Sequence, residues 1–335
     1  MTSARPSLRR HLTYMPVRLG AALATLSLTF VACTGGGQAP VRDGEPLRVV
    51  ATTTVLADLV AQVGGDLVTV TSLVPVGGEV HTFDPSPSDA VTISESRLVV
   101  MNGLGLDEWL RDLAQNAGAA DVPIVELAED LDGVDYLEPA RPGEEDENER
   151  EDEDEEPDED TDHSGETVNP HLWLNVGHTQ KYVEKLIEML KQVDPDHAAG
   201  YDANGAAYLQ RLTKLETWVR DQMAAVPEEN RRVVSFHEAF PYFAAAYDLE
   251  IVGTIVDAPG QDPSAGEIAA LIDGIRDEGV SAIFAESQFP SSLTQTISDE
   301  TGVAVVTDLY NDSLGPPPVD SYVGLIEWDV KRIVE

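Results

Sequence analysis

Short β-rich runs alternate with amphipathic segments from Leu47 to the C-terminus, and this alternation constrains the fold more than any other feature of the chain. It is typical of α/β units built around parallel sheets. The patterns predict strands over residues 48–54, 67–76, 98–102, 122–127, 232–236, 250–256, 281–285 and 303–308. They predict helices over residues 55–63, 88–96, 107–117, 176–192, 195–225, 239–247, 265–278, 291–301 and 322–334, with Ser88 as the N-cap of the second. We therefore expect an α/β fold of two lobes, each with a parallel sheet flanked by helices.

One helical segment is long for a globular protein and lies between the two α/β halves. Its apolar stripe, with spacings of four, three, four and four residues, consists of Tyr208, Leu212, Leu215, Val219 and Met223. We expect an N-terminal lobe at 47–194, one long connecting helix at 195–226 and a C-terminal lobe at 227–335. The alternative is an ordinary surface helix with a frayed start around Gly200 and Gly205. Because open α/β sheets bind ligands outside the carboxyl ends of their strands, we expect the site between the lobes.

The chain is strongly acidic, with 61 Asp and Glu against 21 Lys and Arg and a formal net charge of -40. This charge disfavours partners recognised through a phosphate backbone, so we expect no nucleic-acid partner. Residues 143–162 hold 15 acidic residues and one basic residue, which is -14 of the total. A run of like charge cannot pack, so we expect a disordered acidic loop there.

The N-terminus has the pattern of an export signal. Four arginines precede an apolar run over residues 19–32, which is short for a transmembrane span and ends at Cys33. The sequence Phe-Val-Ala-Cys at 30–33 is similar to a bacterial lipobox, in which the cysteine is lipidated. We expect a signal peptide at 1–32, lipidation of Cys33 and a tether at 33–46; an ordinary secretory signal with an incidental cysteine is the alternative. As the only cysteine, Cys33 excludes an intrachain disulfide framework and a zinc ribbon.

Three of the seven histidines lie after predicted strands or in turn-rich loops. These are His81, His171 and His237, and Asp312 follows the last predicted strand. Three imidazoles and one carboxylate form a tetrahedral set that suits zinc and leaves no open coordination position. A closed site stores, carries or braces a metal, whereas a catalytic zinc keeps a position for water. Each histidine alone is also compatible with an ordinary hydrogen-bonded loop residue.

Four ordered motifs add specific evidence. They are Val-Gly-Gly-Glu-Val-His-Thr-Phe-Asp-Pro-Ser-Pro-Ser-Asp at 76–89, Asn-Pro-His-Leu-Trp-Leu at 169–174, Ser-Phe-His-Glu-Ala-Phe-Pro-Tyr-Phe at 235–243 and Asn-Asp-Ser-Leu at 311–314. With them, the chain from about Leu47 resembles the zinc/manganese solute-binding lipoproteins of bacterial ATP-binding-cassette importers, the metal-binding cluster A-I family. The resemblance implies two α/β lobes joined by a long rigid helix, with metal held in the cleft between them.

The resemblance also implies a ligand set. The first three ligands of the family fall on His81, His171 and His237, and the fourth falls on Asp312, with Asp308 as the rival. Manganese-type members usually carry a carboxylate at the third position, so His237 favours Zn²⁺ over Mn²⁺. Nitrogen-rich sites also favour zinc by the Irving–Williams order.

Several residues around the motifs are candidates for supporting roles. Glu79, Glu238 and Glu286 are candidate acceptors for the ligand imidazole N–H groups, with surface or helix-cap roles as the alternative. Trp173 and Phe240 are expected to pack around the site. The acidic run departs from zinc-type members, whose loop is often rich in histidine, because it is followed only by His163. Two roles of the acidic run remain open: a solvated spacer, or a segment that weakly concentrates cations.

We therefore expect an extracytoplasmic zinc-binding receptor and not an enzyme. It is exported, anchored by lipid on Cys33 to the outer face of the cell membrane, on the periplasmic or extracellular side, and monomeric. Its partners are the zinc ion, as cargo, and a membrane permease. Because imidazoles must be neutral to bind metal, affinity should fall below about pH 6.5.

Two alternatives belong to other functional classes. One is a secreted zinc hydrolase with Glu238 or Glu286 as base, although the sequence has no His-Glu-x-x-His motif and Asp312 would close the site. The other is an adhesin of the cell-adhesion type whose metal only braces the two lobes.

Overall fold

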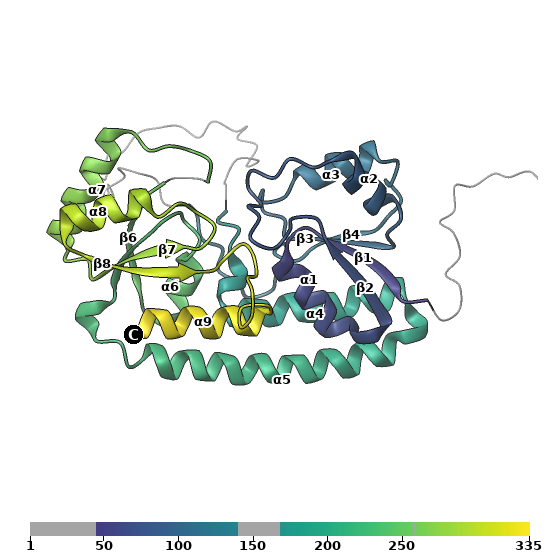
Figure 1. Cartoon of the computed structure of the whole chain (residues 1–335). Helices are drawn as coiled ribbons and strands as arrows, with labels where there is room; N and C mark the ends of the chain where they lie inside the picture. The colour runs from purple at the N-terminus through teal and green to yellow at the C-terminus, as the bar shows by residue number, and fades with distance from the viewer. Residues whose placement is uncertain (1–44, 140–167, 257–258) are drawn as a thin grey trace, which may run out of the picture. The chain divides into compact units, whose positions relative to one another are not determined.

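The computed structural model describes residues 45–139, 168–256 and 259–335 (Figure 1). The expected signal peptide, the lipidation site Cys33, the acidic loop at 143–162 and His163 lie outside these residues. In the ranges given, no helix combines the length and apolar character needed to cross a bilayer.

The N-terminal lobe contains a parallel four-stranded sheet in the order β2-β1-β3-β4. Its strands are β1 (Leu47–Ala51), β2 (Val68–Ser72), β3 (Leu98–Met101) and β4 (Ile124–Glu126). Its helices are α1 (Thr54–Gly64), η1 (Gly65–Leu67), α2 (Pro87–Ser94) and α3 (Trp109–Asn116). Alternate residues of β3 belong to two apolar clusters, one on each face of the sheet. Leu98 and Val100 pack with α1, whereas Val99 and Met101 pack with α2 and α3. Helices therefore cover both faces, which explains the nearly continuous apolar runs of these strands.

The C-terminal lobe repeats this topology in the order β6-β5-β7-β8. Its strands are β5 (Arg232–Ser235), β6 (Glu250–Thr254), β7 (Ala282–Glu286) and β8 (Ala304–Leu309). Its helices are η4 (Glu228–Asn230), α6 (Pro241–Tyr247), α7 (Ala265–Glu278), α8 (Ser292–Thr301) and α9 (Tyr322–Val334). The predicted fold class, two α/β lobes with flanked parallel sheets, is confirmed.

The segments η2 (Leu172–Leu174), α4 (Val176–Val193) and η3 (Pro195–His197) lead into one long helix, α5 (Ala198–Met223), which runs from the N-terminal lobe to the C-terminal lobe. α5 packs against α1 and α4 along its N-terminal part and against α6 and α9 along its C-terminal part (Figure 1). The predicted stripe from Tyr208 to Met223 is buried along its whole length.

One of the apolar clusters is shared by both lobes. It includes Leu59 of α1, Leu212 of α5, Phe243 of α6 and Tyr322 of α9, all of them buried. Because a wide opening of the lobes would expose this shared core, the ligand loops are the parts that can move at low cost.

The chain after β8 returns to the N-terminal lobe before it enters α9. The Leu314 amide donates to Thr54 Oγ1 at 2.8 Å, and the Tyr322 amide donates to Asp58 Oδ2 at 2.9 Å. Thr54 and Asp58 lie four residues apart on α1 and so share one face. Residues 313–322, which the sequence pattern assigns to the C-terminal lobe, are thus bonded to both lobes.

Two local predictions are wrong. Ser86, and not Ser88, is the N-cap of α2, because Asp89 completes a capping box with Ser86 and Pro87 fits the first turn, where no amide donor is needed. β2 ends at Ser72 instead of residue 76, because Pro75 and the positive φ of 73° at Gly77 turn the chain out of the sheet.

The two glycines near the start of α5 do not fray it. A methyl group at Gly205 would lie 2.3 Å from Ile187 Cδ1 of α4, so the glycine permits close helix packing. We expect Gly205→Ala to destabilise the protein by about 1 kcal/mol in urea unfolding, since the clash outweighs the gain in helix propensity. Gly274→Ala in α7 is the matched control, because nothing lies near its added methyl group and the same gain should stabilise by about 0.5–1 kcal/mol. Equal shifts in both variants would contradict this packing.

Candidate metal centre

The four predicted ligands come from four separate loops at one end of the two sheets. His81 lies in the loop after β2, His171 directly precedes η2, His237 follows β5, and Asp312 follows β8. One ligand atom from each side chain lies within 4.8 Å of the others. Residues separated by up to 231 positions thus meet in one cluster, here called the His₃Asp cluster.

The distances in the His₃Asp cluster have the scale of a coordination sphere. The Nε2 atom of His171 lies 3.3 Å from the Nε2 atoms of both His81 and His237. The carboxylate of Asp312 lies 3.6 Å from His81 Nε2, 3.5 Å from His171 Nε2 and 3.6 Å from His237 Nε2. Donors of a tetrahedral zinc site with bonds of about 2.0–2.2 Å lie about 3.3–3.6 Å apart. These five separations fall in that range; the Asp312 distances to His81 and His237 are measured from Oδ2, and the distance to His171 is measured from Oδ1.

Glu286 orients the His237 ring. Both of its carboxylate oxygens contact His237 Nδ1, at 2.9 and 2.8 Å, and both residues are buried. The carboxylate holds the proton on Nδ1, so Nε2 faces the other side chains of the His₃Asp cluster. Glu286 is thus one of the predicted imidazole acceptors, located on the last residue of β7.

Asn169 performs the same task for His171. Its Nδ2 donates to the Glu238 carbonyl at 2.7 Å, which identifies Oδ1 as the acceptor for His171 Nδ1 at 3.1 Å. The proton therefore lies on Nδ1, and the lone pair of Nε2 faces the cluster. The sequence-based prediction missed this role, although Asn169 stands only two residues before His171 in the same motif.

The other two predicted acceptors do not contact a ligand ring through their carboxylates. Glu79 Oε1 accepts instead from the backbone amide of His81 at 2.9 Å and so shapes the loop. The contact of Glu238 with the site is through its backbone carbonyl to Asn169. Trp173 packs against His171 with a ring separation of 5.2 Å, and its Nε1 donates to the Asn311 carbonyl next to Asp312. Phe240 is buried and packs on Phe284 and not on a ligand ring.

Asp312 is completely enclosed. Its side chain is 0% exposed, and among the described residues its Oδ1 atom has no hydrogen-bond partner. A buried carboxylate oxygen without a donor is costly unless a cation neutralises it. Asp308, the rival fourth ligand, lies apart from the cluster; its side chain is 57% exposed and pairs with Arg332 at 3.4 Å.

The protonation of the cluster is uneven. Burial holds the pKa of His171 well below its ordinary value. Burial also acts to lower the pKa of His237, but the charge and hydrogen bond of Glu286 outweigh it and raise this pKa to about 9. For Asp312, burial opposes ionisation, yet the contact with His81 and the three neighbouring imidazoles hold its pKa well below the usual range. In the metal-free cluster, an ionised Asp312 therefore faces a protonated His237.

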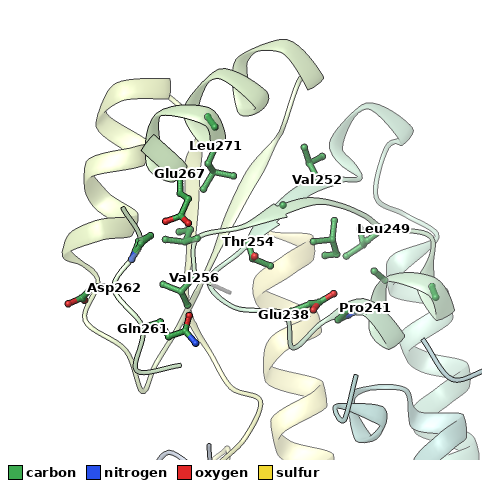
Figure 2. Close-up of a pocket in the computed structure, with 17 residues that line it drawn as sticks. Glu238, Pro241, Leu249, Val252, Thr254, Val256, Gln261, Asp262, Glu267 and Leu271 are labelled. Carbon is green, nitrogen blue, oxygen red and sulfur yellow. The ribbon is translucent and has the colours of Figure 1, made fainter. Parts of the chain in front are cut away.

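The described residues contain another acidic grouping and a separate cavity, and neither resembles the His₃Asp cluster. Glu108, Glu126 and Glu129 lie close together, but Arg111 pairs with the first two. A cavity of about 700 Å³ lies between α6, β6 and α7. Its lining is largely apolar, with carboxylates such as Glu238 at its rim and no histidine among its described lining residues (Figure 2).

Comparison with known proteins identifies the family. Residues 49–335 match the family model described as zinc-uptake complex component A, periplasmic (ZnuA). The chain belongs to this family. Its relatives are substrate-binding receptors of metal importers and not enzymes, so neither the hydrolase nor the adhesin alternative is favoured.

Individual relatives carry names that mention different metals. The chain is 31% identical over 314 residues to the manganese-binding lipoprotein MntA of Halalkalibacterium halodurans, covering 93% of this chain and 95% of the relative. It is 27% identical over 328 residues to the iron transporter substrate-binding lipoprotein MtsA of Streptococcus pyogenes, covering 96% and 97%. The solved periplasmic zinc-binding protein TroA from Treponema pallidum shares the fold, with 22% identity, a TM-score of 0.73 and coverage of 87% of this chain and 98% of that chain. These names do not distinguish zinc from manganese or iron.

Proposed function

We propose that this protein is the extracytoplasmic receptor of an ATP-binding-cassette metal importer, and that its cargo is Zn²⁺. His81, His171, His237 and Asp312 bind one ion, which the receptor delivers to a membrane permease. The observation that carries this proposal is the agreement between the ligand separations of 3.3–3.6 Å and the edges of a tetrahedral zinc site.

The donor chemistry favours zinc. Three imidazole nitrogens suit zinc, whereas manganese prefers carboxylate, carbonyl and water oxygens in six-coordinate geometry. Four protein ligands occupy all positions of a tetrahedral ion, so no position remains for a catalytic water. Manganese is the second candidate, because the manganese-binding lipoprotein MntA is the relative with 31% identity.

The remaining parts of the proposal rest on the sequence pattern and on the family. We propose export, lipid attachment at Cys33 and a location on the outer face of the membrane, in line with relatives named lipoproteins. The division into lobes at 47–194 and 227–335 with a connecting segment at 195–226, and a monomeric state, are proposed on the same basis.

Metal analysis of the protein purified without added metal, followed by competition, tests the function. We expect one equivalent of zinc, which excess manganese does not displace. If the protein instead holds one equivalent of manganese, and manganese displaces zinc, the cargo is Mn²⁺, the second candidate. If the metal-stripped protein binds no divalent transition metal in a calorimetric titration, the proposed function is wrong.

A further inference from the structure

The residue that follows Asp312 bonds to the loop that carries His81. Ser313 Oγ accepts from the Gly77 amide at 2.7 Å and lies 3.2 Å from Thr54 Oγ1. Thr54 Oγ1 in turn accepts from the Leu314 amide at 2.8 Å. Ser313 and Thr54 are both buried, so the Thr54 contacts with Ser313 and Leu314 are shielded from water, whereas the bond to the exposed Gly77 is only partly buried.

The hydrogen bonds of this group are mutually consistent. The Thr54 hydroxyl donates to Ser313 Oγ, and the Ser313 hydroxyl donates to the Leu314 carbonyl at 3.1 Å. Both amide donors, from Gly77 and Leu314, then have acceptors, and neither hydroxyl is left without one. We call Ser313 and Thr54, together with the bond from the Gly77 amide to Ser313 Oγ, the interlobe latch.

His81 differs from the other two histidines in how its ring is held. Asn169 fixes His171 and Glu286 fixes His237, each through Nδ1. In the described part of the chain, the hydrogen bond and ion pair of the His81 ring are with other members of the cluster, His171 and Asp312. Its side chain is 20% exposed, against 2% for the other two rings. The position of His81 therefore depends on the backbone of its loop.

That loop is anchored at two points near the ligand. Gly77 adopts a positive φ of 73°, and the Gly78 amide closes the turn by donating to the Pro75 carbonyl at 2.8 Å. At the second point, four residues after Gly77, the His81 amide donates to Glu79 Oε1. The interlobe latch bonds the turn at Gly77 to Ser313, in the turn that carries Asp312. It therefore sets the distance between the Asp312 carboxylate and His81 Nε2.

We infer that Ser313 and Thr54 are positioning residues that hold His81 in register with the three buried ligands, as Asn169 and Glu286 do for theirs. This inference rests on the proposed function. The loaded site is stable only while the latch is closed, and loss of the Gly77 bond frees His81 first. The latch therefore controls how fast the metal leaves, because a weakened bound state shows mainly as faster dissociation.

Release of zinc into excess chelator, followed by stopped-flow spectroscopy, tests the latch on the full zinc-loaded chain. Ser313→Ala and Thr54→Val should each release zinc about fivefold to tenfold faster than wild type, as expected for one lost net hydrogen bond. Thr54→Ser keeps the hydroxyl and should restore the wild-type rate. Ser96→Ala is the matched control: this serine is also buried and bonds to the Ile93 carbonyl, away from the cluster, so its release rate should equal that of wild type.

Amide hydrogen exchange gives a second readout, and its first part needs only the wild-type protein. In wild type the Gly77 amide should be protected, and Ser313→Ala should remove that protection. An unprotected Gly77 amide in wild type would overturn the inference, as would unchanged release rates in both latch variants or equal acceleration in Ser96→Ala. These outcomes differ from failure of the proposed function, in which wild type itself binds no zinc.

Discussion

Replacing His171 by alanine should lower the affinity for zinc by two to three orders of magnitude. Zinc sites with four protein ligands bind with about 10–16 kcal/mol, which is about 2.5–4 kcal/mol for each ligand. His171 is buried, and its Nε2 lies between the other two imidazoles, so water cannot replace it without disturbing the cluster. Competition titration against a chelator of known affinity measures the loss.

His197→Ala is the matched control for this deletion. His197 is a half-exposed histidine that pairs with Asp194 at the start of α5, away from the His₃Asp cluster. Its replacement should leave zinc affinity unchanged. The ligand assignment would be wrong if His171→Ala bound zinc as tightly as His197→Ala.

Zinc affinity should also fall about tenfold for each pH unit between pH 9 and 7. The metal needs the Nε2 lone pair of His237, and below its pKa of about 9 the ring carries a competing proton. His171, whose pKa is lowered by burial, and Asp312, which stays ionised, add no competition in this range. The sequence-based prediction placed the onset at about pH 6.5, because it used the ordinary histidine value. The contact with Glu286 raises the pH at which the zinc affinity begins to fall.

Glu286→Gln isolates the cause of this pH dependence. The amide oxygen can still accept from His237 Nδ1, but the charge that favours the imidazolium is gone, so burial again lowers the pKa of His237. Near pH 8, calorimetry in buffers of different ionisation enthalpy should show about one proton released per zinc in wild type and almost none in the variant. At pH 9 the affinity of the variant should be about 10–100-fold weaker, because the ring is a less basic ligand.

Glu327→Gln in α9 serves as the comparison, since the half-exposed Glu327 carboxylate pairs, among the residues that the structure describes, with Lys331. It should release the same number of protons as wild type. If Glu286→Gln also released one proton per zinc, the raised pKa of His237 would not be due to this carboxylate.

The regular elements of the fold could be predicted because their signals are local. α7 begins and ends as predicted, since Ser264 and Glu267 form a capping box and Gly279 ends the helix in the left-handed conformation. The start of α2 was misplaced because two serines, each an acceptable N-cap, lie two residues apart, and only the capping box selects Ser86. The shared apolar core could not be predicted, because it depends on how α5 and α9 pack across both lobes.

Strand ends and ordered motifs indicated His81, His171, His237 and Asp312 as ligands, and the structure places these four side chains together. Their role as metal ligands stays a prediction. The residues that hold the ligands were harder to find, because their partners are distant in sequence: Ser313 meets Gly77 from 236 positions away. The pKa of His237 likewise depends on a carboxylate 49 positions away.

X-ray absorption spectroscopy of the zinc-loaded protein tests the central claim most directly. The account predicts four nitrogen and oxygen ligands at about 2.0–2.2 Å, with outer-shell scattering from three imidazoles. A shell of five or six ligands, or scattering from fewer than three imidazoles, would contradict it.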